Sequence, residues 1–181
     1  MASRTSFLFT IFLAFPLLMI THLSARPRAK AANHDLLNTV CSTTQNPSFC
    51  LKALKSDPRS ATADVRGLAK ISIDMARAIA LRTFGIIGSL DKRETNPQLK
   101  KRYALCSVSY DNAIGYAEAA EGSLGTQDYQ SLSIQASAVM SEVDECEESF
   151  KTPPPGSSTI RLANRMLDNL SDIIYEITFL L

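Results

Sequence analysis

Four segments of the chain carry apolar residues at alternating intervals of three and four positions, the spacing that places side chains on one face of a helix. The clearest segment runs from Pro97 to Gly125, with Asn96 as its N-cap and Pro97 at the first helical position, where a missing N–H costs nothing. The next runs to Phe150, with Asp128 or Thr126 as its cap. The two stripes consist of Leu99, Tyr103, Cys106, Tyr110, Ala113, Ala117, Ala120 and Leu124, and of Tyr129, Leu132, Ala136, Val139, Val143, Cys146 and Phe150.

Two further segments complete the pattern. A looser stripe from Val65 to Leu90 leaves Ile73 and Leu81 outside it, and a last stripe follows the proline run at 153–155 and extends to Leu180. Ser157 or Ser158 is the expected cap of the last helix. Four helices of about 23 to 27 residues, joined by short loops, predict an all-α fold in which residues 61–181 form an up-down-up-down four-helix bundle.

Residues 33–60 have a different pattern, which predicts short helices in a disulfide-tied hairpin ahead of the bundle. The chain has four cysteines, for which three pairings are possible. Cys41 and Cys50 flank an Asn-Pro turn signal, which favours a local pair. Cys106 and Cys146 belong to the apolar stripes of consecutive antiparallel helices and would therefore face a shared core. No C-x₂₋₄-C spacing or histidine cluster is present, so we expect no metal site.

The first 25 residues predict a secretory signal peptide. Arg4 precedes a charge-free apolar run that ends at Ile20, and small residues close the segment at Ala25. The run is short for a membrane span, and Pro16 would break a spanning helix. Cleavage after Ala25, or as late as Ala32, predicts a secreted protein with no membrane attachment once the signal is removed.

Charge and residue content narrow the function. The formal net charge is +1 for the whole chain, and removal of the signal leaves between zero and −3, so no basic surface for nucleic acid is expected. His34 is the one histidine outside the signal segment, and we expect it to be a solvated residue of the N-terminal stretch. A serine or cysteine nucleophile would therefore have no histidine to act as its base. The acidic run at 142–148 is expected on a solvated helix surface instead of in a catalytic cleft. We therefore predict that the protein is not an enzyme and needs no cofactor. Asn169 begins a glycosylation sequon within a helix, and whether it carries a glycan stays open.

The combination of a C-x₈-C hairpin with one cysteine in each of the second and third bundle helices resembles the plant invertase and pectin methylesterase inhibitor family. The matching segments are Val40–Cys50, Ser56–Arg59, Tyr103–Ile114, Asp128–Ala138 and Cys146–Phe150. The resemblance implies the disulfides Cys41–Cys50 and Cys106–Cys146. These are the pairs that the turn signal and the helical stripes favour.

The same resemblance implies a stand-alone inhibitor, secreted to the cell wall or apoplast, that binds its target as a monomer in a 1:1 complex and occludes the target's cleft. Family members that inhibit invertase carry Pro-Lys-Phe before the third bundle helix, where this chain has Gln127-Asp128-Tyr129, so pectin methylesterase is the expected target. The alternatives are an inhibitor of acid invertase and a non-inhibitory structural or signalling bundle.

The expected contact residues lie on the second and third bundle helices and at the turn between them: Asn112, Gly115, Asp128, Glu145 and Glu148. We expect Val108, Asn112 and Gly115 to lie beside Ser141, Glu145 and Glu148. Asn112 and Gly115 stand where close relatives often have aspartates, and Glu145 where they often have threonine. Ser171 stands where many relatives have a free cysteine, which makes thiol-linked dimers less expected here.

Overall fold

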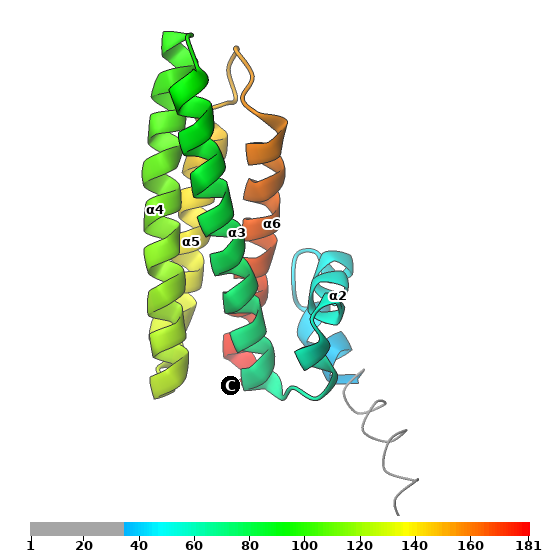
Figure 1. Cartoon of the computed structure of the whole chain (residues 1–181). Coiled ribbons are helices and arrows are strands. Elements are labelled where there is room, and N and C mark those ends of the chain that lie inside the picture. Colours follow the sequence, from blue (N-terminus) through cyan, green and yellow to red (C-terminus); the bar gives the residue numbers. More distant parts are fainter. Residues whose placement is uncertain (1–34) are drawn as a thin grey trace, which may run out of the picture.

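The computed structural model describes residues 35–181, all of whose regular elements are helical (Figure 1). A helical segment at residues 35–42 is followed by α2 (Pro47–Ser56) and the 3₁₀ helix η1 (Pro58–Ala61). The long helices are α3 (Val65–Arg93), α4 (Pro97–Thr126), α5 (Tyr129–Glu148) and α6 (Ser158–Ile177), and η2 (Thr178–Leu180) ends the chain. The predicted all-α class is confirmed.

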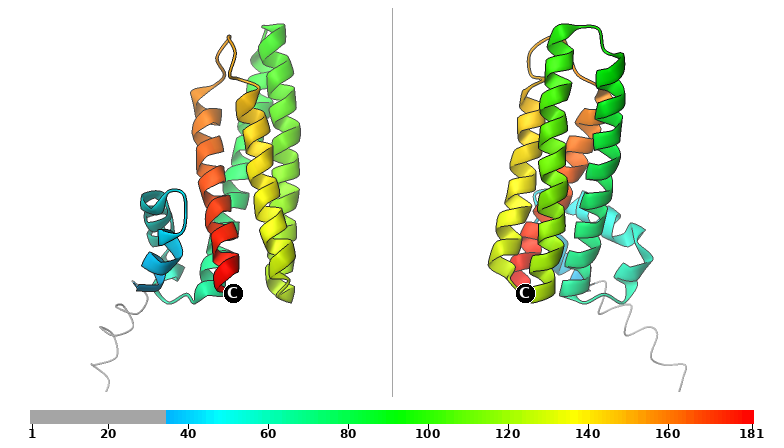
Figure 2. Two further views of the ribbon diagram at one scale, coloured as in Figure 1. Left: turned by 180° about the vertical axis from the view of Figure 1, so that it is seen from behind. Right: turned by 60° about the vertical axis from the view of Figure 1, so that its left-hand side comes forward.

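The four long helices pack in a square, in which each helix runs antiparallel to the next and α6 closes against α3 (Figures 1 and 2). This is the predicted up-down-up-down bundle. The prediction of similar lengths is wrong: α3 and α4 have 29 and 30 residues, whereas α5 and α6 have 20 each. Helix α5 ends before a loop that contains prolines, which cannot continue a helix, and α6 ends where η2 begins. The apolar stripes of α5 and α6 therefore extend past the ends of the two helices.

Side-chain caps determine where the helices start. Asn96 caps α4 by accepting hydrogen bonds from the backbone of its first turn, as predicted. Asp128, and not Thr126, caps α5, with its Oδ1 accepting from the Ser131 N–H at 3.0 Å. Ser157 caps α6. Each cap of this kind stabilises its helix by about 1 kcal/mol.

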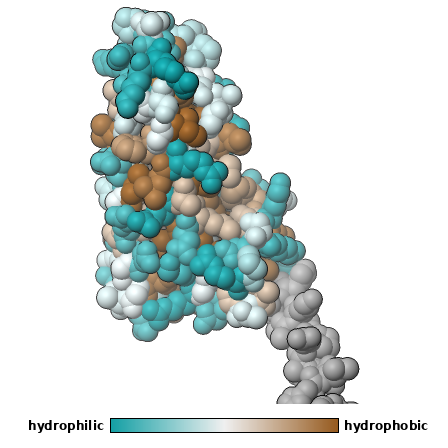
Figure 3. All heavy atoms as spheres, viewed as in Figure 1, coloured by the Kyte–Doolittle hydropathy of each residue, from teal (hydrophilic) through white to brown (hydrophobic). Residues whose placement is uncertain are grey.

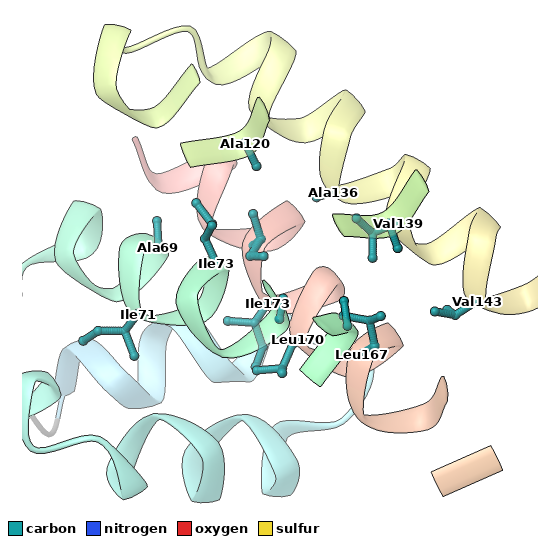
Figure 4. Close-up of a cluster of buried hydrophobic side chains, with 14 of the residues drawn as sticks. Ala69, Ile71, Ile73, Ala120, Ala136, Val139, Val143, Leu167, Leu170 and Ile173 are labelled. Atoms are coloured by element: carbon teal, nitrogen blue, oxygen red, sulfur yellow. The ribbon is translucent and has the colours of Figure 1, made fainter. Parts of the chain in front are cut away.

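The stripes predicted for α4 and α5 form part of the bundle core. Tyr103 and Tyr110 are buried, in line with a core role for both. On α4 the middle of the stripe is alanine, and these small side chains allow α4 to approach its neighbours closely. Figure 4 shows Ala120 and Ala136 facing the larger Ile73 and Ile173 across the interior. Large side chains from α3 and α6 therefore fill the space that the alanines of α4 and α5 leave.

Helix α3 differs from its prediction because it is covered on two sides. Ile73, which the sequence placed outside the stripe, is fully buried at 0% exposure in the bundle core. Ile71 is also buried, and it points toward the N-terminal hairpin in Figure 4. Leu81, expected outside the stripe, is 46% exposed. The last helix also departs from its stripe, because Leu180 lies in η2 and is 40% exposed.

The N-terminal hairpin, residues 35–61, lies outside the square beside α3 and α6 (Figures 1 and 2). Cys41 and Cys50 form a disulfide that ties its two helices together. Val40 and Leu54 are fully buried against the bundle. The buried carboxylate of Asp172 on α6 accepts a hydrogen bond from the Gln45 N–H at 2.8 Å, which attaches the turn of the hairpin to α6.

Candidate protein-binding face

The outer surfaces of α4 and α5 form one continuous face, which we call the α4–α5 face. Its geometry is set by the disulfide Cys106–Cys146, which joins the two helices at a Cα–Cα distance of 4.7 Å. One and a half helical turns along α4, Asn112 donates from Nδ2 to Glu142 Oε1 at 3.1 Å. These two links fix the register of the antiparallel pair, so side chains on the two helices keep constant neighbours.

A buried hydrogen-bond network supports this face from beneath. The Tyr110 hydroxyl donates to Asn164 Oδ1 at 2.7 Å, and Asn164 Nδ2 donates to Glu147 Oε2 at 2.8 Å. Glu147 also pairs with Arg161. Burial raises the pKa of Tyr110, so its hydroxyl keeps the proton that it donates. The network connects α4, α5 and α6, and buried polar networks that are fully satisfied make a core rigid.

Beyond the first turns of α4, which carry Lys100, Lys101 and Arg102, the charges on α4 and α5 have one sign. Residues 107–148 contain nine aspartates and glutamates and no lysine or arginine. Four of these carboxylates form ion pairs, namely Glu118 with Arg77, Glu121 with Lys70, Glu147 with Arg161 and Glu148 with Lys151. The other five form no ion pair within residues 35–181: Asp128, Glu142, Asp144 and Glu145, and Asp111, which lies on the α3 side of α4 and outside the α4–α5 face. Carboxylates without a partner charge are available to a basic surface on another protein.

Exposed apolar side chains accompany these acids. Val108 on α4 and Ile134 on α5 are 62% and 61% exposed, and Tyr116 is 38% exposed. Apolar and aromatic side chains next to charged ones are typical of the centre of a protein–protein contact. Sequence reasoning overlooked Ile134 and Tyr116 as contact residues, because a stripe analysis discards apolar residues that lie off the core face.

The predicted contact residues form an extended strip instead of a cluster. Asn112 and Gly115 are exposed on α4, and Glu145 is exposed on α5. Asp128 lies at the α4–α5 turn, about 25 Å along α5 from Glu145 at the rise of a helix. Glu148 lies near the other end of α5, where it pairs with Lys151. Asn112 donates to Glu142, which follows Ser141 on α5 and which the sequence analysis did not single out.

The turn between the helices presents Asp128 in a defined position. Gln127 ends α4 with a left-handed backbone, at φ 62°, and the Asp128 N–H donates back to the Ser123 carbonyl at 2.9 Å. Hydrogen bonds from Ser131 lower the pKa of Asp128, so this carboxylate stays ionised at a lower pH than a free aspartate. One carboxylate oxygen serves as the helix cap, and the side chain is exposed.

Three other predictions concern residues away from this face. The Asn169 Nδ2 donates to the Arg165 carbonyl, and Ser171 in the same sequon is fully buried. Within residues 35–181, no three or more His, Cys, Asp or Glu side chains are grouped so as to hold a metal ion. Across the same residues, no helix is both long enough and apolar enough to span a membrane. The predicted signal peptide and His34 lie outside the described residues.

The fold and the face define a class: a disulfide-linked four-helix bundle with a helical hairpin at its N-terminus and an acidic face of paired helices. Residues 35–178 match the family model described as plant invertase/pectin methylesterase inhibitor. The chain therefore belongs to this family.

Individual relatives agree with this assignment. A pectinesterase inhibitor from Actinidia deliciosa is 46% identical over 165 residues, which is 91% of this chain and 89% of the relative. A putative invertase inhibitor from Platanus acerifolia is 32% identical over 75% of this chain and 76% of its own. A crystal structure of a mutant form of a pectin methylesterase inhibitor from Arabidopsis superposes with a TM-score of 0.75 at 30% identity, covering 80% of this chain and 96% of that one.

Proposed function

We propose that this protein is a secreted inhibitor of pectin methylesterase, which binds the enzyme in a 1:1 complex through the α4–α5 face and occludes the pectin-binding cleft. The observation that carries this proposal is the face itself, where exposed Val108, Ile134 and Tyr116 share the surface of α4 and α5 with carboxylates that form no ion pair. The similarity to the Actinidia pectinesterase inhibitor supports the choice of target, since it exceeds that to the putative invertase inhibitor. Removal of residues 1–25 and export to the cell wall are part of the proposal.

Inhibition of this kind needs no chemical step in the inhibitor. The disulfide and the network under Tyr110 hold the helices rigid, so little conformational entropy is lost when the face binds. Apolar side chains at the centre supply the area that is removed from water, and the carboxylates select a basic surface and accelerate the encounter. The polymer is excluded because the inhibitor occupies its space.

The five predicted contact residues have distinct roles in this proposal. Glu145 and Asp128 offer carboxylate oxygens and have no partner charge within residues 35–181. Asn112 has its Nδ2 engaged by Glu142, which leaves its Oδ1 for the enzyme. At Gly115 nothing lies within 4 Å of the position a Cβ would take, so the enzyme's side chains approach the α4 backbone closely there. Glu148 keeps its ion pair with Lys151 and lies at the edge of the α4–α5 face.

The test compares two exposed acids of the α4–α5 face with one exposed acid on the α3 side of α4. Glu145→Lys on the face is expected to raise the inhibition constant by at least about tenfold, because it places a cation against a basic surface. Asp128→Asn keeps the helix cap, since asparagine caps as well as aspartate, and is expected to weaken inhibition by about threefold through loss of charge alone. Inhibition by the unaltered protein is expected to weaken as salt is added.

Asp111→Asn is the matched control. Asp111 is exposed on α4, but it lies seven residues before Glu118, whose side chain pairs with Arg77 of α3, so it belongs to the side that faces away from α5. Its substitution is expected to leave inhibition within about twofold. Equal effects of Asp111→Asn and Asp128→Asn would contradict the choice of face, and so would inhibition that does not depend on salt.

A further inference from the structure

A second surface of the molecule has the features of a ligand site. A cleft of about 540 Å³ opens where the N-terminal hairpin meets the bundle. It is lined by apolar side chains from three helices: Phe49 and Ala53 of α2, Met75 and Ile79 of α3, and Leu162 and Met166 of α6. Figure 3 shows apolar residues gathered at this junction on the face seen in Figure 1. The size and lining are those of sites that bind small organic molecules.

The charged residues that line the cleft are both cations. Lys52 of α2 and Arg82 of α3 line it, and no aspartate or glutamate does. Neither cation forms an ion pair within residues 35–181. The cleft thus combines an apolar floor with two unpaired cations, which is the complement of a molecule with an apolar body and an anionic head.

The shape of the cleft favours a linear ligand. Its lining on α3 extends from Met75 to Arg82, and its lining on α6 extends from Leu162 to Leu170. At the rise of an α-helix these stretches span roughly 10 to 12 Å. Two of the lining residues are methionines, whose flexible side chains adapt to an alkyl chain. A cleft of this length follows the helix axes.

We infer that this cleft binds a single-chain amphiphile with an anionic headgroup, of the class of medium-chain fatty acids. The alkyl chain lies along Phe49, Met75, Ile79 and Met166, and the carboxylate is held near Lys52 and Arg82. The inference does not rest on the proposed inhibition: the cleft is formed by α2, α3 and α6, whereas the α4–α5 face is formed by the other two bundle helices.

The test titrates the full chain, purified with both disulfides intact, with a dansyl-labelled undecanoic acid and follows the dansyl fluorescence. The expected result is saturable binding at one site that decanoate reverses, with decanol at least about fivefold weaker as a competitor because it lacks the charge. Absence of saturable binding would overturn the inference. Equal competition by decanol would overturn the role given to Lys52 and Arg82.

Variants locate the ligand. Ala78 lines the cleft and is exposed, so Ala78→Trp fills the groove without crowding the core, and it is expected to weaken probe binding by at least about tenfold. Arg82→Gln is expected to weaken it by about threefold to fivefold. The controls are Leu81→Gln and Lys55→Gln, exposed positions next to the cleft that do not line it, for which no change is expected. Probe binding that survives Ala78→Trp would refute the location.

Discussion

The two disulfides close loops of very different length, which predicts different contributions to stability. Cys106–Cys146 spans 40 residues, and Cys41–Cys50 spans 9. A cross-link stabilises a fold mainly by reducing the conformational entropy of the unfolded chain, and the reduction grows with the logarithm of the loop length. At 25 °C this relation gives about 4 kcal/mol for the longer loop and about 2.5 kcal/mol for the shorter one.

The comparison uses paired alanine substitutions, Cys106→Ala with Cys146→Ala in one variant and Cys41→Ala with Cys50→Ala in the other. All four side chains are at most 1% exposed, so the cost of the cavity left by each pair is similar and cancels in the difference. Urea unfolding followed by circular dichroism measures both free energies. We expect the bundle variant to lose about 1.5 kcal/mol more than the hairpin variant. Equal losses, or the reverse order, would refute the loop-entropy argument.

Four single substitutions test local features by the same unfolding assay. Gln127→Gly is expected to stabilise the protein by about 0.5 to 1 kcal/mol, since residue 127 has a left-handed backbone; a loss would contradict this. Gly156→Ala is expected to cost about 1 to 3 kcal/mol, because the new Cβ would lie 2.4 Å from the Phe150 ring, whereas Gly122→Ala has open space and should stabilise the helix by about 1 kcal/mol. Burial, and then neighbouring aspartates, raise the pKa of Asp168 above its unfolded value, so its ionisation opposes folding as pH rises. Asp168→Asn should therefore stabilise the fold at pH 7 by roughly 0.5 kcal/mol after solvent screening. This gain should disappear as pH falls toward the unfolded pKa near 4. A gain that does not change with pH would contradict the electrostatic cause.

Regular packing made most of the fold predictable from the sequence. The apolar stripe on α4 could be recognised because α4 buries one narrow face, and Asn96 and Pro97 indicated where the helix begins. The predicted stripe on α3 mixed two buried sides: Ile73 faces the bundle core, whereas Ile71 and Met75 lie on the side that the hairpin covers. The spacing along α3 does not reveal that a distant hairpin covers this second side. The length of α5 was overestimated because Phe150 stays buried in the loop after the helix has ended.

The candidate face was predictable only in part. Glu145 follows from its position on helices that Cys106 and Cys146 indicate as a pair, whereas Asp128 was expected from the resemblance to the inhibitor family. Ile134 went unnoticed, because an exposed apolar residue carries no periodic signal and is recognised only when its surroundings are known. The bond between Asn112 and Glu142 depends on the exact rotation of both helices about their axes, which residue spacing alone does not determine.

The central claim is that the α4–α5 face inhibits pectin methylesterase, and the most direct measurement is a titration of the enzyme with the purified protein. A plant pectin methylesterase at about pH 6 is followed by acid release from pectin, with an acid invertase assayed in parallel at matched concentrations. We predict stoichiometric loss of esterase activity at one inhibitor per enzyme, with invertase unaffected. Loss of invertase activity instead, or of neither activity, would contradict the proposed function.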